Sequence, residues 1–301
     1  MIEFGGIFML YYLVAIGATL LLTGDFASQK SYQRLQGATA KAGFFFNSTQ
    51  GVFVMLLFLA LTGFSVGFSG YSLLMAAAFS TLCFTYSLIG FKIMEYGSMS
   101  VYTVFLMAGG MTIPYVWGLL FLDEAFSWFR MAGLVLILAA VIITGGKMKL
   151  GGYKPLLLCI LVFVLNGFVS VISKLHAIET VRPTVNSMQF VFWTAAARFI
   201  LCGAALVLLV LRQKKPGERA LSVKPKAVFW IGTSALVGNV SYLMQLVCAE
   251  YLPASVLYPI VTGGSVIMTA LSAWLFFREK PDKRTWFGIV ICFAGTCMFL
   301  W

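Results

Sequence analysis

The chain has 301 residues, of which 61% are hydrophobic and only 10% are charged. Soluble globular domains carry about a quarter of charged residues, whereas the mean hydropathy here is +0.96. The composition therefore excludes a soluble globular protein and indicates an all-α integral membrane protein.

The apolar runs predict ten transmembrane helices. A helix needs about 20 apolar residues to cross a hydrocarbon core of roughly 30 Å. In chain order such windows cover residues 8–28, 44–64, 71–92, 99–121, 130–147, 155–175, 186–211, 227–249, 253–277 and 285–301. Residues 1–6 contain no Lys or Arg ahead of the first run, so we expect a retained first helix rather than a cleaved signal peptide.

Two parts of the sequence repeat one another. Residues 95–139 align with residues 250–294 at a constant offset of 155 without a gap. Four of the seven Glu residues fall into two of the identical pairs, which shared hydrophobicity does not explain. The pairs include Glu95/Glu250, Tyr96/Tyr251, Ser100/Ser255, Val101/Val256, Gly109/Gly264, Leu120/Leu275, Phe121/Phe276, Glu124/Glu279, Gly133/Gly288, Val135/Val290 and Ala139/Ala294.

The repeat predicts two five-helix units, residues 1–150 and residues 151–301. Because five helices cross the membrane an odd number of times, the second unit enters with the opposite orientation. Inverted repeats of this kind are a transporter architecture, in which a site between the halves opens to each side in turn. The duplication therefore predicts alternating access.

The net charge of +11 follows the connections between helices. Of 21 Lys and Arg residues, 20 lie in connections or at helix ends, and 17 of these fall on one side of the membrane. The positive-inside rule places that side in the cytoplasm and both termini outside, and this basic rim argues against a nucleic-acid partner. The 17 are Lys30, Arg34, Lys41, Lys92, Lys147, Lys149, Lys154, Arg212, Lys214, Lys215, Arg219, Lys224, Lys226, Arg278, Lys280, Lys283 and Arg284; the other side has Arg130, Lys174 and Arg182.

Few residues are suited to catalysis or to metal binding. The six Cys residues all lie in apolar helices without a C-x-x-C pair, and His176 is the only histidine. A P-loop is also absent. We therefore expect no metal, no cofactor and no enzymatic activity.

Residues 97–145 and 252–300 resemble the last two helices of the EamA domain of the drug/metabolite transporter superfamily. Each stretch has Ser-Val shortly after a Glu-Tyr, an acidic residue closing one helix and a glycine opening an apolar final helix. The last two positions are Glu124 and Gly133 in the first copy, and Glu279 and Gly288 in the second.

The resemblance implies a bacterial-type fold of ten helices in two inverted halves, with a central path lined mainly by helices 1, 3, 4, 6, 8 and 9. It usually implies cytoplasmic termini, which conflicts with the charge count; we give the charge count more weight. The first two helices are similar instead to a poorly described bacterial group with Gln-Lys near the end of helix 1, here Gln29-Lys30.

Arg198 is the clearest candidate for a functional polar residue. It lies near the middle of the seventh apolar window, where a charge costs about 2.5–3.5 kcal/mol on insertion scales. It is expected either to hold an anionic substrate group or to pair with a carboxylate such as Asp25. A purely structural ion pair is the competing interpretation.

The first and sixth helices offer further candidates for substrate binding or coupling. Asp25 is the leading coupling residue, because a buried carboxyl group can exchange protons, and Lys30 follows if helix 1 extends to about Gln33. Asn166 and Lys174 lie in the counterpart helix. The alternative is that residues 25–41 form a solvated connection.

Polar and aromatic residues of the third, fourth, eighth and ninth helices complete the predicted site. Tyr86 and Tyr242 fall within one residue of each other under the repeat offset, so both are expected to face one cavity. Ordinary packing or interfacial anchoring is the alternative. The other candidates in these helices are Thr103, Asn239, Gln245 and Tyr258, with Pro114 and Pro259 as helix interruptions.

Three smaller features have both a functional and a structural interpretation. Glu95 and Glu250 are a candidate gate or interfacial residues at helix ends. Residues 47–50, Asn-Ser-Thr-Gln, form a polar patch that we assign to the N-terminus of helix 2. Gly63 and Gly67 form a G-x-x-x-G that predicts close helix packing.

The sequence favours a secondary transporter that moves a small organic metabolite or drug-like solute, with proton coupling left open. Its expected surroundings are the cell inner (plasma) membrane, as a monomer or weak homodimer. The alternative is a non-transporting membrane protein on the same scaffold, such as a lipid scramblase, a sensor or a membrane-embedded enzyme. Asp25 and Arg198 leave the charge of the solute open.

Overall fold

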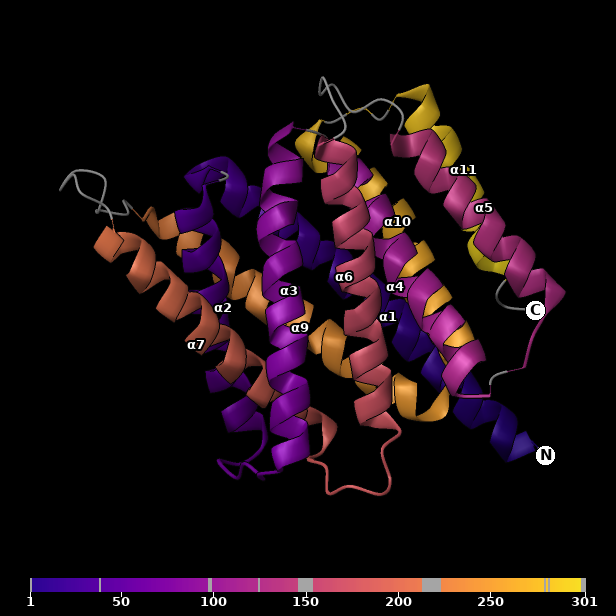
Figure 1. Cartoon of the computed structure of the whole chain (residues 1–301), viewed down its shortest axis with the longest axis horizontal. Coiled ribbons are helices and arrows are strands. Elements are labelled where there is room, and N and C mark those ends of the chain that lie inside the picture. Colours follow the sequence, from indigo (N-terminus) through magenta and orange to yellow (C-terminus); the bar gives the residue numbers. More distant parts are fainter. Residues whose placement is uncertain are drawn as a thin grey trace.

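The structure is a computed structural model that describes residues 2–37, 39–96, 99–123, 125–145, 154–212, 223–278, 280 and 282–298, and within these ranges all regular structure is helical. Figure 1 shows the helices with their labels. They are α1 (Ile2–Gln36), α2 (Ala40–Leu61), α3 (Gly70–Tyr96), α4 (Met99–Phe121), α5 (Trp128–Gly145), α6 (Lys154–Ala177), α7 (Ser187–Arg212), α9 (Pro225–Tyr251), α10 (Ala254–Phe277) and α11 (Lys283–Met298).

These helices confirm the predicted all-helical membrane fold. Each of the ten apolar windows corresponds to one helix. By length and composition, eight of them can cross a membrane. The described part of α5 contains a shorter apolar helical stretch, Trp128–Ala140, and α11 has 16 residues. The predicted unit boundary near residue 150 lies outside the described residues.

The first helix is longer than its apolar window. α1 continues through Asp25 and Lys30 to Gln36, and both side chains are buried, with exposed fractions of 9% and 7%. The interpretation of residues 25–41 as a solvated connection is therefore wrong. Lys30 consequently does not belong to the solvated basic rim in which the charge count placed it.

Hydrogen bonds to neighbouring helices hold the polar end of α1 in helical form. Gln33 Nε2 donates to the carbonyl of Phe91 in α3 at 3.0 Å, and Arg34 Nη2 donates to the carbonyl of Phe277 in α10 at 2.9 Å. The helix ends at Gln36 and is followed by Gly37, whose φ of 81° suits a residue without a Cβ. Tertiary contacts thus extend the helix beyond the run of apolar residues.

Two interpretations of the second helix are wrong because its bounds differ from the apolar window. α2 begins at Ala40, so residues 47–50 lie two turns inside it rather than at its N-terminus. It ends at Leu61, so Gly63 and Gly67 belong to the connection to α3 and cannot form a helix-packing motif within α2.

The helices pack in pairs that relate the two predicted units. α2 packs against α7, α4 against α10 and α5 against α11, and each of these pairs joins a helix to its counterpart. The other main contacts come in matched sets, with α1–α9 corresponding to α3–α6, and α1–α10 to α4–α6. In Figure 1 the α5–α11 pair and the α2–α7 pair form opposite edges of the molecule, with α3 and α6 between them.

The largest buried apolar cluster surrounds α4. It includes Phe105 and Met111 of α4, Ile137 of α5 and Ile289 of α11. Gly109 allows the backbone of α6 to approach, because a Cβ at this position would collide with the carbonyl of Phe163. The α4–α6 contact is consequently made at the backbone, as is common between membrane helices.

Candidate functional site

A cavity of about 160 Å³ lies among α1, α2, α3, α4, α6, α7, α9 and α10. No described residue of α5 or α11 reaches its wall. The wall includes all six helices that the family resemblance implied, together with the second and seventh. Eight predicted site residues line it: Asp25, Tyr86, Asn166, Arg198, Asn239, Tyr242, Gln245 and Tyr258.

A series of hydrogen bonds connects the two charged residues of the wall. Arg198 Nη1 donates to Gln50 Oε1 at 2.7 Å, and Gln50 Nε2 donates to Ser234 Oγ at 2.8 Å. The Ser234 hydroxyl donates in turn to Asp25 Oδ1, while Gln29 Nε2 donates to Asp25 Oδ2 at 2.9 Å. We call the series from Arg198 to Asp25 the Asp25–Arg198 relay.

The relay compensates two charges in a low-dielectric environment. Its three hydrogen bonds all donate in the direction of the carboxylate, so each bond polarises the next. A buried charge is tolerated in a membrane protein when it has partners of this kind. Arg198 and Asp25 are therefore not in direct contact. They are connected through the neutral side chains of Gln50 and Ser234.

Two glycines bring the members of the relay together. A Cβ at Gly51 would lie 2.9 Å from the carbonyl of Ala195, so α2 can approach α7 closely beside Gln50. A Cβ at Gly238 would lie 2.7 Å from Asp25 Cγ, so this glycine makes room for the carboxylate between α1 and α9. Both glycines place polar side chains within hydrogen-bonding distance.

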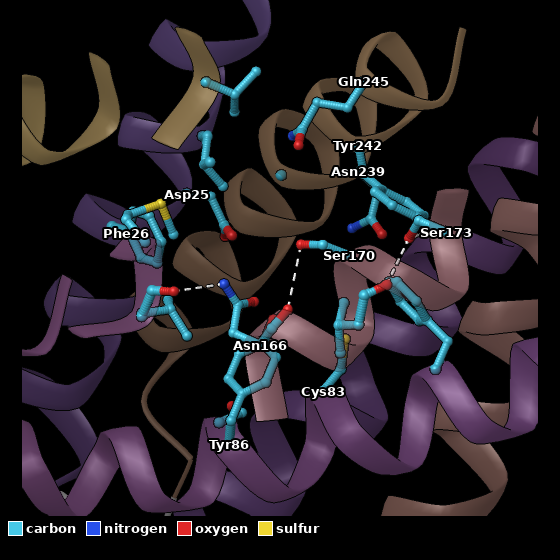
Figure 2. A pocket seen from close by; sticks show the side chains of 18 of the residues that line it. Asp25, Phe26, Cys83, Tyr86, Asn166, Ser170, Ser173, Asn239, Tyr242 and Gln245 are labelled. Atoms are coloured by element: carbon cyan, nitrogen blue, oxygen red, sulfur yellow. Dashed lines mark hydrogen bonds between the residues drawn. The ribbon is translucent and has the colours of Figure 1, made fainter. Parts of the chain in front are cut away.

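The opposite wall contains Asn166 and four hydroxyl-bearing residues. Asn166 Nδ2 donates to the carbonyl of Leu106 in α4 at 2.7 Å. Tyr258 donates to the carbonyl of Ser170 at 3.0 Å, and Tyr242 lies 3.0 Å from Ser173 Oγ. Figure 2 shows Asn166, Ser170, Ser173 and Tyr242 around the same space as Asp25. The structure therefore gathers side chains from eight helices into one site.

The two repeat-related tyrosines do face one cavity. Tyr86 of α3 and Tyr242 of α9 both line the wall, and the ring of Tyr242 lies 5.0 Å from that of Phe79. Phe79, Tyr86 and Tyr242 belong to one apolar cluster, so aromatic rings form part of the cavity wall.

Three of the predicted residues lie behind the wall. Thr103 is buried within α4 and Lys30 within α1. Lys174 Nζ donates to the carbonyl of Ala249, a wall residue, at 3.1 Å. These side chains contribute to the surroundings of the cavity rather than to its surface.

Of the two candidate gate residues, Glu250 is separated from the cavity wall. Glu250 Oε1 accepts a hydrogen bond of 2.9 Å from Ser187 at the start of α7, in an exposed position. The side chain of Glu95 lies outside the described part of the structure, as do Glu124, Glu279 and the side chain of Pro259. Pro114 lies inside α4.

Gln50 and Ser234 are the important residues that the sequence did not assign to the site. Gln50 was included in the polar patch of helix 2, and Ser234 was not singled out. Neutral polar side chains are common in membrane helices and carry no insertion penalty comparable to that of a charge. Only their positions between Asp25 and Arg198 distinguish them.

His176 and five of the six cysteines are buried, and of these Cys83 lines the cavity wall. His176 Nε2 lies 2.9 Å from Ser72 Oγ, and its ring stacks on Phe190 at 3.8 Å. In the described ranges, no three His, Cys, Asp or Glu residues are grouped as a metal site would require.

A multi-pass helical membrane protein with a polar cavity between its helices has the architecture of a transporter. Residues 153–301 match the model of the EamA-like transporter family. The chain is 32% identical over 74 residues to the "probable 4-amino-4-deoxy-L-arabinose-phosphoundecaprenol flippase subunit ArnE" of Hamiltonella defensa, covering 25% of this chain and 66% of the relative. It is 31% identical over 88 residues to the protein of that name from Yersinia pestis, covering 29% and 74%.

A solved crystal structure is similar over 96% of this chain and 95% of its own length, with a TM-score of 0.64 and 16% identity, which shows a shared fold. Together with the sequence relatives, the matched family shows that the chain belongs to the EamA-like transporter family of the drug/metabolite transporter superfamily. It is a multi-pass membrane transporter of that type.

Proposed function

We propose that the protein is a secondary transporter, without enzymatic activity, that moves a small organic solute by alternating access through the central cavity. The observation that carries the proposal is the Asp25–Arg198 relay in the cavity wall. Two compensated charges inside a membrane protein mark a pathway for a solute or an ion. Asp25 is the residue we assign to proton coupling.

The relay also connects the two proposed halves, residues 1–150 and 151–301. Arg198 and Ser234 belong to the second half, whereas Gln50 and Asp25 belong to the first. Each of the three successive hydrogen bonds therefore crosses from one half to the other. An exchange of conformations between inverted halves would rearrange these bonds, which makes the relay suited to linking solute binding to movement.

The relatives favour a second candidate function. They are named as subunits of a flippase for a lipid-linked aminated sugar. The 88 residues aligned with the Yersinia pestis protein make up 29% of this chain but 74% of the relative, so the relative is less than half as long. Because of the names of these relatives, the alternative to a carrier of free solutes is a protein that moves a lipid-linked solute, or a scramblase.

Flux measurements distinguish these functions. Purified protein in liposomes is expected to exchange at least one radiolabelled free solute from a panel of amines, polyols and organic acids, with saturation at high concentration. Movement of a fluorescent lipid between leaflets, without saturable exchange of any free solute, would support the flippase or scramblase alternative and contradict our proposal.

We further propose that the protein lies in the inner membrane as a monomer or weak homodimer, with both termini outside. A cysteine introduced at Leu300, in a variant whose native cysteines are replaced by Ala, is expected to react with an impermeant maleimide on intact cells. The result is expected because 17 of 20 Lys and Arg residues in the connections fall on the side opposite the termini, which the positive-inside rule places in the cytoplasm. Labelling that requires permeabilised cells would show that the termini lie in the cytoplasm and would contradict the proposed orientation.

A further inference from the structure

Six side-chain amides line the cavity. Gln50 belongs to the Asp25–Arg198 relay, and each of the other five is anchored to the protein through its nitrogen. Four of them donate to a neighbouring carbonyl or hydroxyl oxygen, and one donates to a carboxylate. They are Asn47 to the carbonyl of Gly43 at 2.9 Å, Asn166 to that of Leu106 at 2.7 Å, Asn239 to that of Ala235 at 3.0 Å, Gln245 to Ser241 Oγ at 3.2 Å and Gln29 to Asp25 Oδ2 at 2.9 Å.

The anchoring partners determine which end of each amide is the nitrogen. A backbone carbonyl can only accept a hydrogen bond, so the amide atom facing it must be a donor. The same holds for Gln245, because the Ser241 hydroxyl already donates its proton to the carbonyl of Ala18 at 2.6 Å. The oxygen of each amide therefore points away from its anchor.

These oxygens are open to the cavity. None of the five receives a hydrogen bond within the described part of the chain, yet none is among the buried polar atoms that lack a partner. Figure 2 shows the amides of Asn166, Asn239 and Gln245 and the carboxylate of Asp25 around one space. Since Asp25 retains lone pairs beyond its two hydrogen bonds, it adds further acceptors.

Four hydroxyl groups in the wall direct their protons to other protein atoms. Tyr258 donates to the carbonyl of Ser170, Thr262 donates to that of Tyr258, and Ser173 donates to that of Val169. With the Ser173 proton directed to its own helix, the Tyr242 hydroxyl donates to Ser173 Oγ. These hydroxyl groups therefore direct their protons into the protein, and the amide and carboxylate oxygens remain as fixed acceptors. The donors of the wall also include the guanidinium of Arg198 and the hydroxyls of Ser87, Tyr86 and Tyr102.

We propose that the cavity recognises a solute through several N–H or O–H donors on its polar group, as in a primary amine or a polyol. The inference rests on the proposed transport function and specifies the class of solute for it. A site built from oriented acceptors strongly rejects an analogue that lacks the matching donors, because the acceptors then lose water without gaining a partner.

The competing explanation is recognition of positive charge alone. Tyr86, Tyr242 and Phe79 place aromatic rings beside the cavity, and aromatic rings attract quaternary ammonium groups that have no N–H donors. Donor recognition and charge recognition therefore predict opposite rankings for a primary amine and its fully methylated analogue.

Binding of two matched pairs of probes tests the proposal on the purified full-length protein. The first pair is 2-phenylethylamine and trimethyl(2-phenylethyl)ammonium, which share a ring and a positive charge. The second pair is 3-phenylpropane-1,2-diol and its dimethyl ether, which are neutral. Isothermal titration is expected to show at least about tenfold tighter binding of the donor-bearing member in one pair or both. The pair that responds identifies the amine or the hydroxyl as the recognised donor.

Equal or tighter binding of the methylated member in both pairs would overturn the proposal in favour of charge or ring recognition. A failure of all four probes to bind would overturn the proposal as well, since the cavity would then not recognise N–H or O–H donors on a small aromatic solute.

Gln245 allows a test at one acceptor. Gln245→Met keeps the length of the side chain but removes the oxygen, and is expected to lower the preference for the donor-bearing probe about fivefold while the methylated probe binds as before. Gln189→Met makes the same change on α7 outside the cavity wall and is expected to leave the preference unchanged. An unaltered preference in Gln245→Met would remove this oxygen from the recognition site.

Flux measured on the same preparation separates the inference from the transport function. Donor-dependent binding without flux of any free solute would leave the recognition site standing and remove the proposed transport. Saturable flux restricted to solutes without donors would support the proposed transport and contradict the recognition of donors.

Discussion

Replacement of Asp25 by Asn is expected to lower solute flux about a hundredfold. Asparagine has the shape of aspartate but cannot supply the negative charge that compensates Arg198 through Gln50 and Ser234. Breaking a buried charge pair at one end costs roughly 3–5 kcal/mol, and each 1.4 kcal/mol corresponds to about a tenfold change in a population. A conformation stabilised by the relay would therefore lose much of its population.

Exchange of labelled solute into proteoliposomes measures this effect, and Asp282→Asn is the matched control. Asp282 accepts hydrogen bonds from the backbone and side chain of Thr285 at the start of α11, away from the cavity. Asparagine serves equally well at a helix N-terminus, so flux is expected to stay near the native value. Flux in Asp25→Asn equal to that of the control would remove Asp25 from the transport mechanism.

The fold could be predicted from the sequence because the membrane constrains it strongly. Runs of about 20 apolar residues can satisfy their backbone groups only as helices, and the positions of the ten helices follow from this. The end of α1 could not be predicted in the same way. Its last two turns contain Gln33 and Arg34, which are held by carbonyls of α3 and α10, and no local pattern encodes those partners.

The candidate site was only partly visible in the sequence for a related reason. Arg198 and Asp25 are conspicuous because charges are costly inside a membrane. The neutral side chains of Gln50 and Ser234 have a much smaller insertion free energy. Their importance arises from the approach of α2 to α7 at Gly51 and of α1 to α9 at Gly238. Such approaches depend on pairs of residues far apart in the sequence, so a single sequence does not reveal them.

The stability of the protein should show whether the relay acts as one unit. Arg198→Gln is expected to destabilise the protein by about 3 kcal/mol, because Asp25 then remains buried without its distant counter-charge. The double variant Asp25→Asn, Arg198→Gln removes both charges and is expected to be more stable than the sum of the two single changes predicts. A coupling of at least about 1 kcal/mol is expected, within the range measured for residues in one network.

Unfolding in mixed detergent micelles, followed for all four members of the cycle, measures this coupling. The same four-member cycle in a Gln50→Leu background supplies an independent comparison, since this change interrupts the relay between the charges without removing either one. If the relay transmits the interaction, the coupling between Asp25 and Arg198 should fall when Leu replaces Gln50. Additive effects of the two charge changes would mean instead that each charge is compensated by its own immediate neighbours. The three hydrogen bonds that cross between the halves would then hold the helices together without linking the charges, and the coupling of solute binding to movement would have to reside elsewhere in the cavity wall.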